Sequence, residues 1–305
     1  MTLELLLDDA PGPAPLALAV ELGWVSLPAP TRTVAGLNAA LARERPEALA
    51  LLPVAEYAEL QESHIILPAL AAGGQHGAAT VLVSDRPLEE VEGPLVDLDG
   101  VSRTAEMFAR ATLAKFYGIT GAGWLRERAA GPAGGGDEAE TMVAVADDGG
   151  EAAPAPGAPP AERPTLLVRE GGEALHLLDE PGGAVVADFG RAWFILTGLP
   201  AVSHLLLARR DLLDREEERA RVQGLIDALP AALDTVRQRR RELRRTLSDR
   251  YGVSRDLLND FYNDQFLTLT GDAQRATLTL FERGAWGMGL PTVARLGLAP
   301  GAAHV

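Results

Sequence analysis

The sequence has no cysteine among its 305 residues. This absence excludes disulfide bonds, thiolate metal sites, iron–sulfur clusters and a cysteine nucleophile. Aromatic residues are few, at 5%, and no apolar run reaches the roughly 18 residues that a membrane-spanning helix needs. Positive charge is also scarce, because 28 Lys and Arg stand against 43 Asp and Glu and leave a formal net charge of -15. We therefore expect no nucleic-acid and no membrane partner, although a local site can still bind a small anion.

The beginning of the sequence gives no sign of export. It lacks the basic start of a signal peptide, and Asp8 and Asp9 interrupt its apolar run. Together with the absence of cysteine, this favours a cytoplasmic location. The hydrophobic share of 47% is enough for a buried core, and the length favours two lobes over one compact unit.

Strand-like and helix-like segments alternate along most of the chain. Helical periodicity covers 104–117, and everything from 212 onward reads as helical, with Pro230 expected to kink or divide one helix. This alternation is typical of an α/β fold. Residues 129–163 have the composition of a low-complexity loop, interrupted by a short apolar segment at 141–146. The expected strands are 2–7, 48–52, 76–85, 94–98 and 201–211, and 165–170 and 182–190 are expected to be strands or extended segments.

One stretch, residues 96–118, raises the question of a binding site. An apolar run ends at Gly100, and a helix begins after Ser102, Arg103 and Thr104. The first turn of a helix leaves backbone N–H groups without partners and carries partial positive charge, which suits a carboxylate or a phosphate. Ser and Thr are also ordinary helix caps, so the same residues fit a turn that binds nothing. From the residues alone both interpretations stay open.

Other candidate sites are weaker. The five histidines show no metal-ligand spacing, so we expect no metal, and the glycine-rich segments 72–77 and 131–136 match no nucleotide-binding motif. His204 lies in an apolar strand and reads as a core or cleft-wall residue. The run 237–245 holds six Arg in nine residues and reads as a solvated helix face, with a partner-binding surface as the alternative.

Three stretches, taken in order, resemble a known family. They read "LNAALARERPEALALLPVAEYAEL", "LVSDRPLEEVEGPLVDLDGVSRTAEMFARATL" and "VADFGRAWFILTGLPAVSHLLLARRD". In order and spacing they are similar to the MqnA-type chorismate dehydratases of the futalosine route to menaquinone. The resemblance covers about two-thirds of the chain and is poor over 120–180.

The resemblance implies a two-lobed fold like that of type 2 periplasmic binding proteins, with a helical cluster at the C-terminal end. The expected division is 1–86 for the first part of lobe one, 87–190 for lobe two, and 191–305 for the return to lobe one. The chain is then expected to cross between lobes near 84–88 and again near 187–199.

The resemblance also implies a reaction. Its members remove water from chorismate and give 3-[(1-carboxyvinyl)oxy]benzoate without a cofactor. The substrate is a small-molecule carboxylate held between the lobes, and the protein is expected to be a monomer or a homodimer. Under this resemblance Gly100, Ser102, Arg103 and Thr104 become substrate-binding candidates, and Asp147 falls where the family carries an "IGD" strand end.

Two elements of the family pattern are missing here. Many members carry "Y-L-N-T-x-P-L" near the start, and Gly12 and Pro13 stand where its Asn and Thr would be. The family's "S-S-x-E-Y" is reduced to "PVAEY", with Pro53 at a hydroxyl position. The sequence thus supports two hypotheses, a chorismate dehydratase or close relative and a non-catalytic anion-binding paralogue on the same fold. A third, an interaction protein that uses the helices of 212–250, rests only on their basic face.

Overall fold

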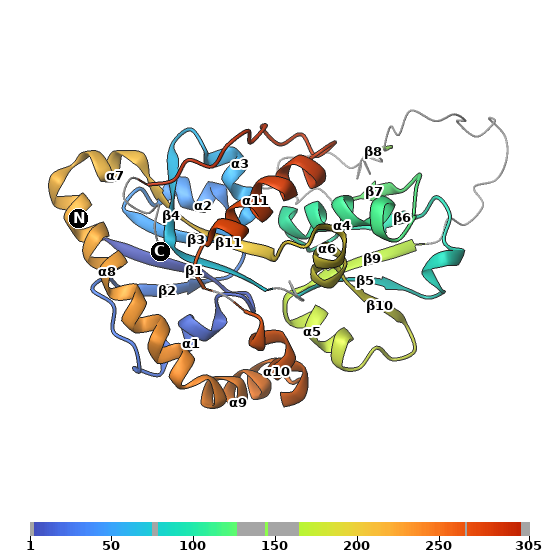
Figure 1. The fold of residues 1–305 in the computed structure, drawn as a ribbon, viewed down its shortest axis with the longest axis horizontal. Coiled ribbons are helices and arrows are strands. Elements are labelled where there is room, and N and C mark those ends of the chain that lie inside the picture. Colours follow the sequence, from blue (N-terminus) through green and yellow to red (C-terminus); the bar gives the residue numbers. More distant parts are fainter. Residues whose placement is uncertain (1–2, 75–78, 127–143, 146–164, 266, 300–305) are drawn as a thin grey trace, which may run out of the picture.

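Two β-sheets lie end to end along the long axis of the protein (Figure 1). The computed structural model describes residues 3–74, 79–126, 144–145, 165–265 and 267–299. Within these residues the first sheet has five strands and the second has six, and helices cover both. The predicted α/β class is confirmed. Apart from 144–145, the predicted low-complexity loop lies outside the described residues, and so does Asp147.

The first sheet has the strand order β2-β1-β3-β11-β4. Strand β1 runs parallel to β2 and β3, whereas β11 runs antiparallel to β3 and to β4. The C-terminal ends of β1 and β3 therefore meet the N-terminal end of β11 at one edge, where His204 pairs with Pro53. The strands are β1 (Glu4–Asp8), β2 (Thr31–Val34), β3 (Ala48–Pro53), β4 (His64–Gly74) and β11 (Ala201–Arg209).

The second sheet has the order β10-β5-β9-β6-β7-β8 and is also mixed, because β5 runs antiparallel to β9 and β10 while β6 runs parallel to β9 and β7. Since β5 belongs to this sheet, the chain crosses between sheets before residue 80, and the expected crossing at 84–88 is corrected. The return crossing lies between Asp188 and Ala201, close to the expected place. The strands are β5 (Thr80–Ser84), β6 (Leu95–Asp97), β7 (Gly123–Leu125), β8 (Ala144–Val145), β9 (Thr165–Glu170) and β10 (Val185–Asp188).

Most of the helices after the return strand pack on the outside of the first sheet (Figure 1). Helix α8 continues through Pro230, so the proline does not divide the helix, and the chain turns only at Arg239. Within the described residues no helix is long and apolar enough to cross a membrane. The helices are α1 (Ala14–Glu21), α2 (Ala39–Glu44), α3 (Tyr57–Leu60), α4 (Arg103–Phe116), α5 (Gly171–Asp179), α6 (Phe189–Thr197), α7 (Arg210–Asp214), α8 (Glu216–Gln238), α9 (Arg240–Tyr251), α10 (Arg255–Asn263) and α11 (Gly271–Gly284), with short 3₁₀ turns η1 (Val54–Glu56) and η2 (Leu88–Glu90).

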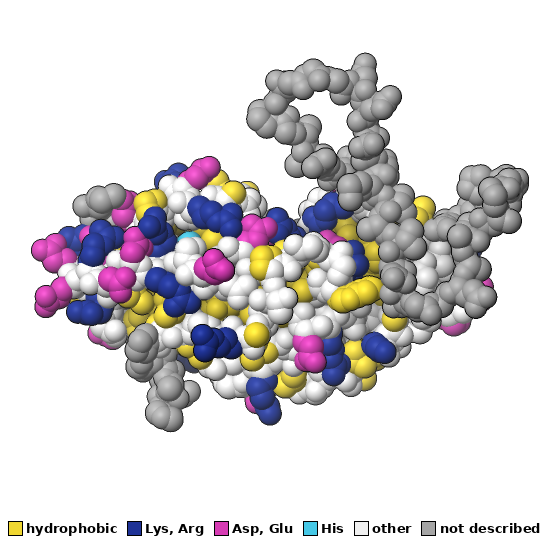
Figure 2. All heavy atoms as spheres, turned by 90° about the horizontal axis from the view of Figure 1, so that it is seen from above, with side chains coloured by type: hydrophobic (Ala, Val, Ile, Leu, Met, Phe, Trp, Pro, Cys, Tyr) yellow, Lys and Arg dark blue, Asp and Glu magenta, His cyan; other side chains and the backbone are white. Residues whose placement is uncertain are grey.

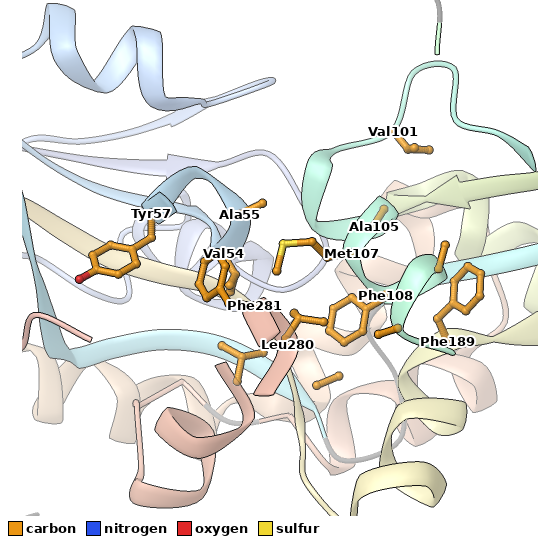
Figure 3. Packing of buried hydrophobic residues seen from close by; sticks show 14 of the residues in the cluster. Val54, Ala55, Tyr57, Val101, Ala105, Met107, Phe108, Phe189, Leu280 and Phe281 are labelled. Carbon is orange, nitrogen blue, oxygen red and sulfur yellow. The ribbon is translucent and has the colours of Figure 1, made fainter. Parts of the chain in front are cut away.

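A continuous apolar core joins the two lobes (Figure 3). Helix α4 contacts both the turn η1 of lobe one and the helix α11: Met107 points toward Val54 and Ala55 of η1, and Phe108 lies between Leu280 of α11 and Phe189. Helix α11 approaches α4 so closely that a Cβ at Gly284 would lie 2.4 Å from the carbonyl oxygen of Met107. The packing fixes the N-terminal end of α4 relative to the strand ends of lobe one, and this junction positions the site described next.

The face seen in Figure 2 carries basic and acidic side chains intermixed over the lobe that contains the first sheet. Because charges of opposite sign lie next to one another there, that face offers no extended area of one charge. The residues that could bind a ligand line a cleft between the two lobes.

Candidate functional site

A cleft of about 700 Å³ opens between the two lobes. Lobe one contributes the ends of β1 and β3, the start of β11 and the turn before α2, and lobe two contributes the N-terminal end of α4 and the end of β9. A crevice at the carboxyl ends of parallel strands is the usual ligand site of α/β sheets. The polar and charged side chains in its lining are Asp8, Asp9, Asn38, Glu56, Glu59, Thr80, Ser102, Arg103, Thr104, Arg126, Glu170, Ser203, His204 and Gln265.

Four of the five residues proposed from the sequence line this cleft, namely Gly100, Ser102, Arg103 and Thr104. Gly100 has a φ of 70°, a left-handed conformation that glycine adopts without strain, and it lets the chain turn from β6 into α4. The four residues are therefore close together on one wall of the cleft. Whether they hold a ligand stays a prediction.

Ser102 is the N-cap of α4, and its partners include a carboxylate of the protein itself. Its Oγ accepts a hydrogen bond from the Ala105 N–H at 3.2 Å, which is ordinary capping. The Ser102 N–H and O–H both donate to Glu170, at 2.5 Å and 2.8 Å. The N-terminal end of α4, which the sequence suggested as an anion-binding site, thus already binds the carboxyl group of Glu170.

Burial raises the pKa of Glu170 above its usual value, and the nearby Asp8 acts in the same direction. The two hydrogen bonds from Ser102 and the proximity of His204 oppose that rise because they favour the charged carboxylate. Burial and hydrogen bonding therefore act on the pKa of Glu170 in opposite directions.

A similar arrangement occurs at α2. Its Ala39 N–H donates to Glu56 Oε2 at 2.8 Å, while Asn38 caps the helix by accepting from Leu41 N–H at 3.1 Å. Glu56 is buried and belongs to the "PVAEY" segment. Its place at this helix end gives it a structural use, since it satisfies a backbone donor that would otherwise lack a partner.

The two arginines that line the cleft are both paired with carboxylates of the protein. Arg103 forms a close ion pair with Glu59, whose pKa the Arg103 hydrogen bond lowers. Arg126 donates to Glu106 at 2.9 Å and to the carbonyl of Val101 at 3.0 Å. An incoming anion would meet arginines whose charge is already shared with carboxylates.

Thr104 forms a hydrogen bond that connects the two lobes. Its side chain is 5% exposed, and its Oγ1 accepts a hydrogen bond from the Ala55 N–H at 3.0 Å. Its own O–H remains a donor. This contact ties the start of α4 to the turn η1 of lobe one.

The opposite wall holds a chain of hydrogen bonds that the sequence did not reveal. His204 Nε2 lies 3.1 Å from Asp8 Oδ2, and His204 Nδ1 lies 2.9 Å from Ser203 Oγ. Asp8 and His204 are only 8% and 6% exposed, whereas Ser203 is half-buried. Carboxylate, imidazole and hydroxyl in series are the groups of general acid–base chemistry.

A β-bulge makes the Ser203–His204 contact possible. Neighbouring residues of a regular strand point to opposite faces. The pairing of β11 with β4 shifts register between Val202, opposite Gly73, and His204, opposite Ala72, so Ser203 is the extra residue. The bulge turns both side chains to the same side, as bulges near functional sites often do.

Sequence reasoning gave His204 as a core or cleft-wall residue and did not identify its hydrogen-bond partners. Asp8 is 196 positions away, and strand periodicity would have separated Ser203 from His204. The adjacent Ser-His pair was the one available signal, and only the register shift gives it meaning.

Gly12, which the sequence resemblance sets opposite an Asn, lines the cleft directly beside Ser203 and His204. A Cβ there would lie 3.0 Å from Ser203 Oγ, 3.2 Å from Ala72 Cβ and 3.3 Å from His204 Nδ1. Ser203 and His204 therefore occupy the space that a side chain at position 12 would need.

Among the described residues no group of three or more histidine, aspartate or glutamate side chains could hold a metal ion.

The family model described as menaquinone biosynthesis matches residues 14–125 and 165–285, which is most of the chain. No curated protein matches the sequence.

Several solved structures have the same fold. Protein AF1704 from Archaeoglobus fulgidus aligns with a TM-score of 0.59 at 16% identity, over 94% of this chain and 97% of that one. The alkanesulfonate-binding protein SsuA from Xanthomonas axonopodis pv. citri, bound to MOPS, aligns with a TM-score of 0.59 at 13% identity, over 98% and 96%. SsuA from Escherichia coli, a periplasmic aliphatic sulphonate binding protein, aligns with a TM-score of 0.54 at 13% identity, over 91% and 84%. At these identities the likeness is one of fold, and it confirms the predicted periplasmic-binding-protein architecture.

Proposed function

The chain belongs to the menaquinone biosynthesis family, and on that basis we propose that it is a lyase of the chorismate dehydratase type. Its substrate is chorismate or a close carboxylate relative, and its product is the aromatic 3-[(1-carboxyvinyl)oxy]benzoate. The observation that carries this proposal is the cleft itself. It combines a helix N-terminus with Ser102 on one wall and the buried Asp8–His204 pair with Ser203 on the other.

The cleft suits a small polar ligand by size and by lining. Its volume of about 700 Å³ lies within the range of roughly 300–1,000 Å³ that small-molecule sites usually have. Both lobes supply polar groups, so closure of the lobes would surround the ligand and exclude water. Lobe closure also matters chemically, because an elimination passes through a charged species that bulk water would quench.

Ligand binding requires an exchange of partners at α4. A substrate carboxylate that reaches the Ser102 N–H and O–H must displace Glu170, or meet it in its protonated form. Burial, which raises the pKa of Glu170, lowers the cost of the second route. Ser102, Thr104, Arg103 and the turn at Gly100 are therefore proposed as the substrate-binding wall, with Asp147 kept as a proposed contact from the sequence.

A second candidate function has its own support. Gly12 and Pro53 replace two polar positions of the family pattern, and the proteins with a similar fold include an aliphatic sulphonate binding protein and an alkanesulfonate-binding protein. A non-catalytic protein that binds a small anion would keep the scaffold and lose these groups.

A direct assay separates the two candidates. Purified protein is mixed with chorismate, and mass spectrometry follows the aromatic enol ether while thermal unfolding follows binding. Product formation supports the lyase. A stabilisation by chorismate without product supports the binding protein, and at a hundredfold excess over Kd that stabilisation is about 2.7 kcal/mol. The absence of both signals would reject both candidates.

We propose a cytoplasmic protein, active as a monomer or a homodimer, whose division at 1–86, 87–190 and 191–305 is shifted so that β5 is counted with lobe two.

A further inference from the structure

We propose that Ser203, His204 and Asp8 act as one proton-transfer unit, with Ser203 Oγ as the atom that meets the ligand. The identity of its substrate rests on the proposed function, but the activation of Ser203 does not.

The hydrogen-bond partners determine the direction in which a proton can move through the unit. An ionised carboxylate can only accept hydrogen bonds, so its contact with His204 requires the proton on Nε2. The Asp8 carboxylate is itself held in place, because its Oδ1 accepts from the Leu37 N–H at 3.1 Å. With Nε2 protonated, Nδ1 of a neutral ring presents its lone pair to Ser203 Oγ at 2.9 Å. The ring is thus oriented to take a proton from the hydroxyl.

The hydroxyl has a second acceptor for the other state of the unit. Ser203 Oγ also lies 3.1 Å from the Ala72 carbonyl oxygen. When His204 carries a proton on Nδ1, the Ser203 O–H can turn to Ala72 and leave its oxygen as an acceptor for the imidazolium. Both protonation states are satisfied without movement of the backbone.

The absence of a side chain at Gly12 keeps Ser203 reachable. The loop around it is fixed from the other side, since Gln265 donates to the Gly12 carbonyl at 2.6 Å and Tyr262 donates to the Pro11 carbonyl at 3.0 Å. A side chain on this fixed loop would press against Ser203 and His204. Gly12 is therefore a requirement of the unit rather than a simple loss.

In the proposed elimination, one proton leaves a ring carbon and one returns to the leaving hydroxyl. Ser203 Oγ receives the C–H proton as its own proton passes to His204 Nδ1. The carbon–oxygen bond then breaks. Ser203 Oγ passes the proton taken from carbon to the departing hydroxide, and His204 Nδ1 returns the serine proton to Oγ. One C–H and one C–O bond break, one carbon–carbon double bond and one water form, and the unit ends in its starting state.

The first experiment needs no substrate. The protein is treated with a phosphonofluoridate probe, and the labelled residue is mapped by mass spectrometry. Ser203 Oγ attacks phosphorus, fluoride leaves, and His204 takes the hydroxyl proton. We expect labelling at Ser203, its loss in Ser203→Ala, and a rate at least tenfold slower in His204→Gln. If His204→Gln does not fold, Asp8→Asn provides the same test.

The chain offers a matched control. Ser63 and His64 form the same contact, with Oγ 2.9 Å from Nδ1, away from the residues that line the cleft. We expect Ser63 to stay unlabelled and Ser63→Ala to label at Ser203 like the wild type. Labelling of both serines at similar rates, or labelling of Ser203 that does not depend on His204 and Asp8, would overturn the proposal. So would the absence of any label at Ser203.

The second experiment separates this proposal from the proposed function. With chorismate, we expect Ser203→Ala to lower kcat by a factor of about 10²–10⁴ with KM changed much less. If the wild type forms product and Ser203→Ala keeps its kcat, the unit is wrong and the lyase stands. If the wild type forms no product while Ser203 labels through His204, the lyase is wrong and the unit stands.

Discussion

The two Ser-His pairs of this protein lie near opposite ends of two neighbouring antiparallel strands, β4 and β11, of the first sheet. Ser63–His64 stands where β4 begins, and Ser203–His204 stands near the start of β11, its antiparallel partner. Each serine hydroxyl is 2.9 Å from the Nδ1 of the following histidine. Both imidazoles are buried. The contact is the same, so any difference in chemistry must come from the surroundings.

The surroundings differ mainly in charge. Burial lowers the pKa of His64 to about 4, and the cations Arg209, Arg43 and Arg210 add to that effect against Asp211. At neutral pH His64 is therefore a neutral core group. His204 instead contacts the carboxylate of Asp8 and lies near Glu170, and it opens onto the cleft. Only this second pair has both an orienting carboxylate and room for a ligand.

The strongest test of this contrast restores the family's side chain. We expect Gly12→Asn to lower turnover of chorismate by about a hundredfold, because its Cβ meets Ser203 Oγ at 3.0 Å and disturbs the proton-transfer unit. Overpacking of this kind also costs about 1–3 kcal/mol of unfolding free energy. Steady-state kinetics and urea unfolding measure both effects. A rise in activity would show that the Asn chemistry of the family still fits this cleft.

The next test addresses His64 through pH. Its folded pKa of about 4 lies below the ordinary 6.5, so the unfolded chain binds the proton more readily. His64 thus destabilises the fold as pH falls from 6.5 to 4, by about 3 kcal/mol in all, and has no such effect above that window. We expect His64→Leu to flatten the pH dependence of unfolding free energy by that amount. Parallel curves for wild type and variant between pH 4 and 6.5 would contradict it.

A smaller effect is expected from the acid that faces His204. Glu170→Gln keeps the shape of the group at the start of α4 but removes its charge. We expect a carboxylate ligand to bind about tenfold more tightly, a gain of about 1.4 kcal/mol, because it no longer competes with Glu170. Titration calorimetry with a benzoate ether measures the change. Because its pKa is raised in the fold, Glu170 weakens stability as pH rises above 4.5, so the variant is also expected to be less sensitive to pH there.

The smallest change in stability and ligand affinity is expected from Ser102, the N-cap of α4. Ser102→Ala removes the hydroxyl that caps α4 and donates to Glu170, and we expect a loss of about 1 kcal/mol in unfolding free energy. Binding of the carboxylate ligand should weaken severalfold while the fold persists. Ser254→Ala is the matched control, because Ser254 caps α10 in the same way and does not line the cleft. Equal ligand affinity in the two variants would remove Ser102 from the binding wall.

Local signals predicted much of the fold. The apolar period of α4 with Ser102 before it gave a helix that begins where expected, and Gly198, with its left-handed φ of 68°, ends α6 as the Gly-Leu-Pro sequence indicated. Strand β4 was missed because Pro68 interrupts it. The proline is tolerated because β4 is an edge strand of its sheet. Helix α5 was missed because two glycines open it.

The sequence by itself determined most of the elements, the α/β class, and the turn and cap at Ser102, since periodicity, caps and turns act over a few residues. Tertiary structure alone decided what those groups contact. It brought Glu170 to the cap of α4, and it joined Asp8 to His204 across 196 positions. A one-residue shift in strand register turned Ser203 toward His204. Contacts of that kind depend on how strands pair and how lobes pack, which no local pattern encodes.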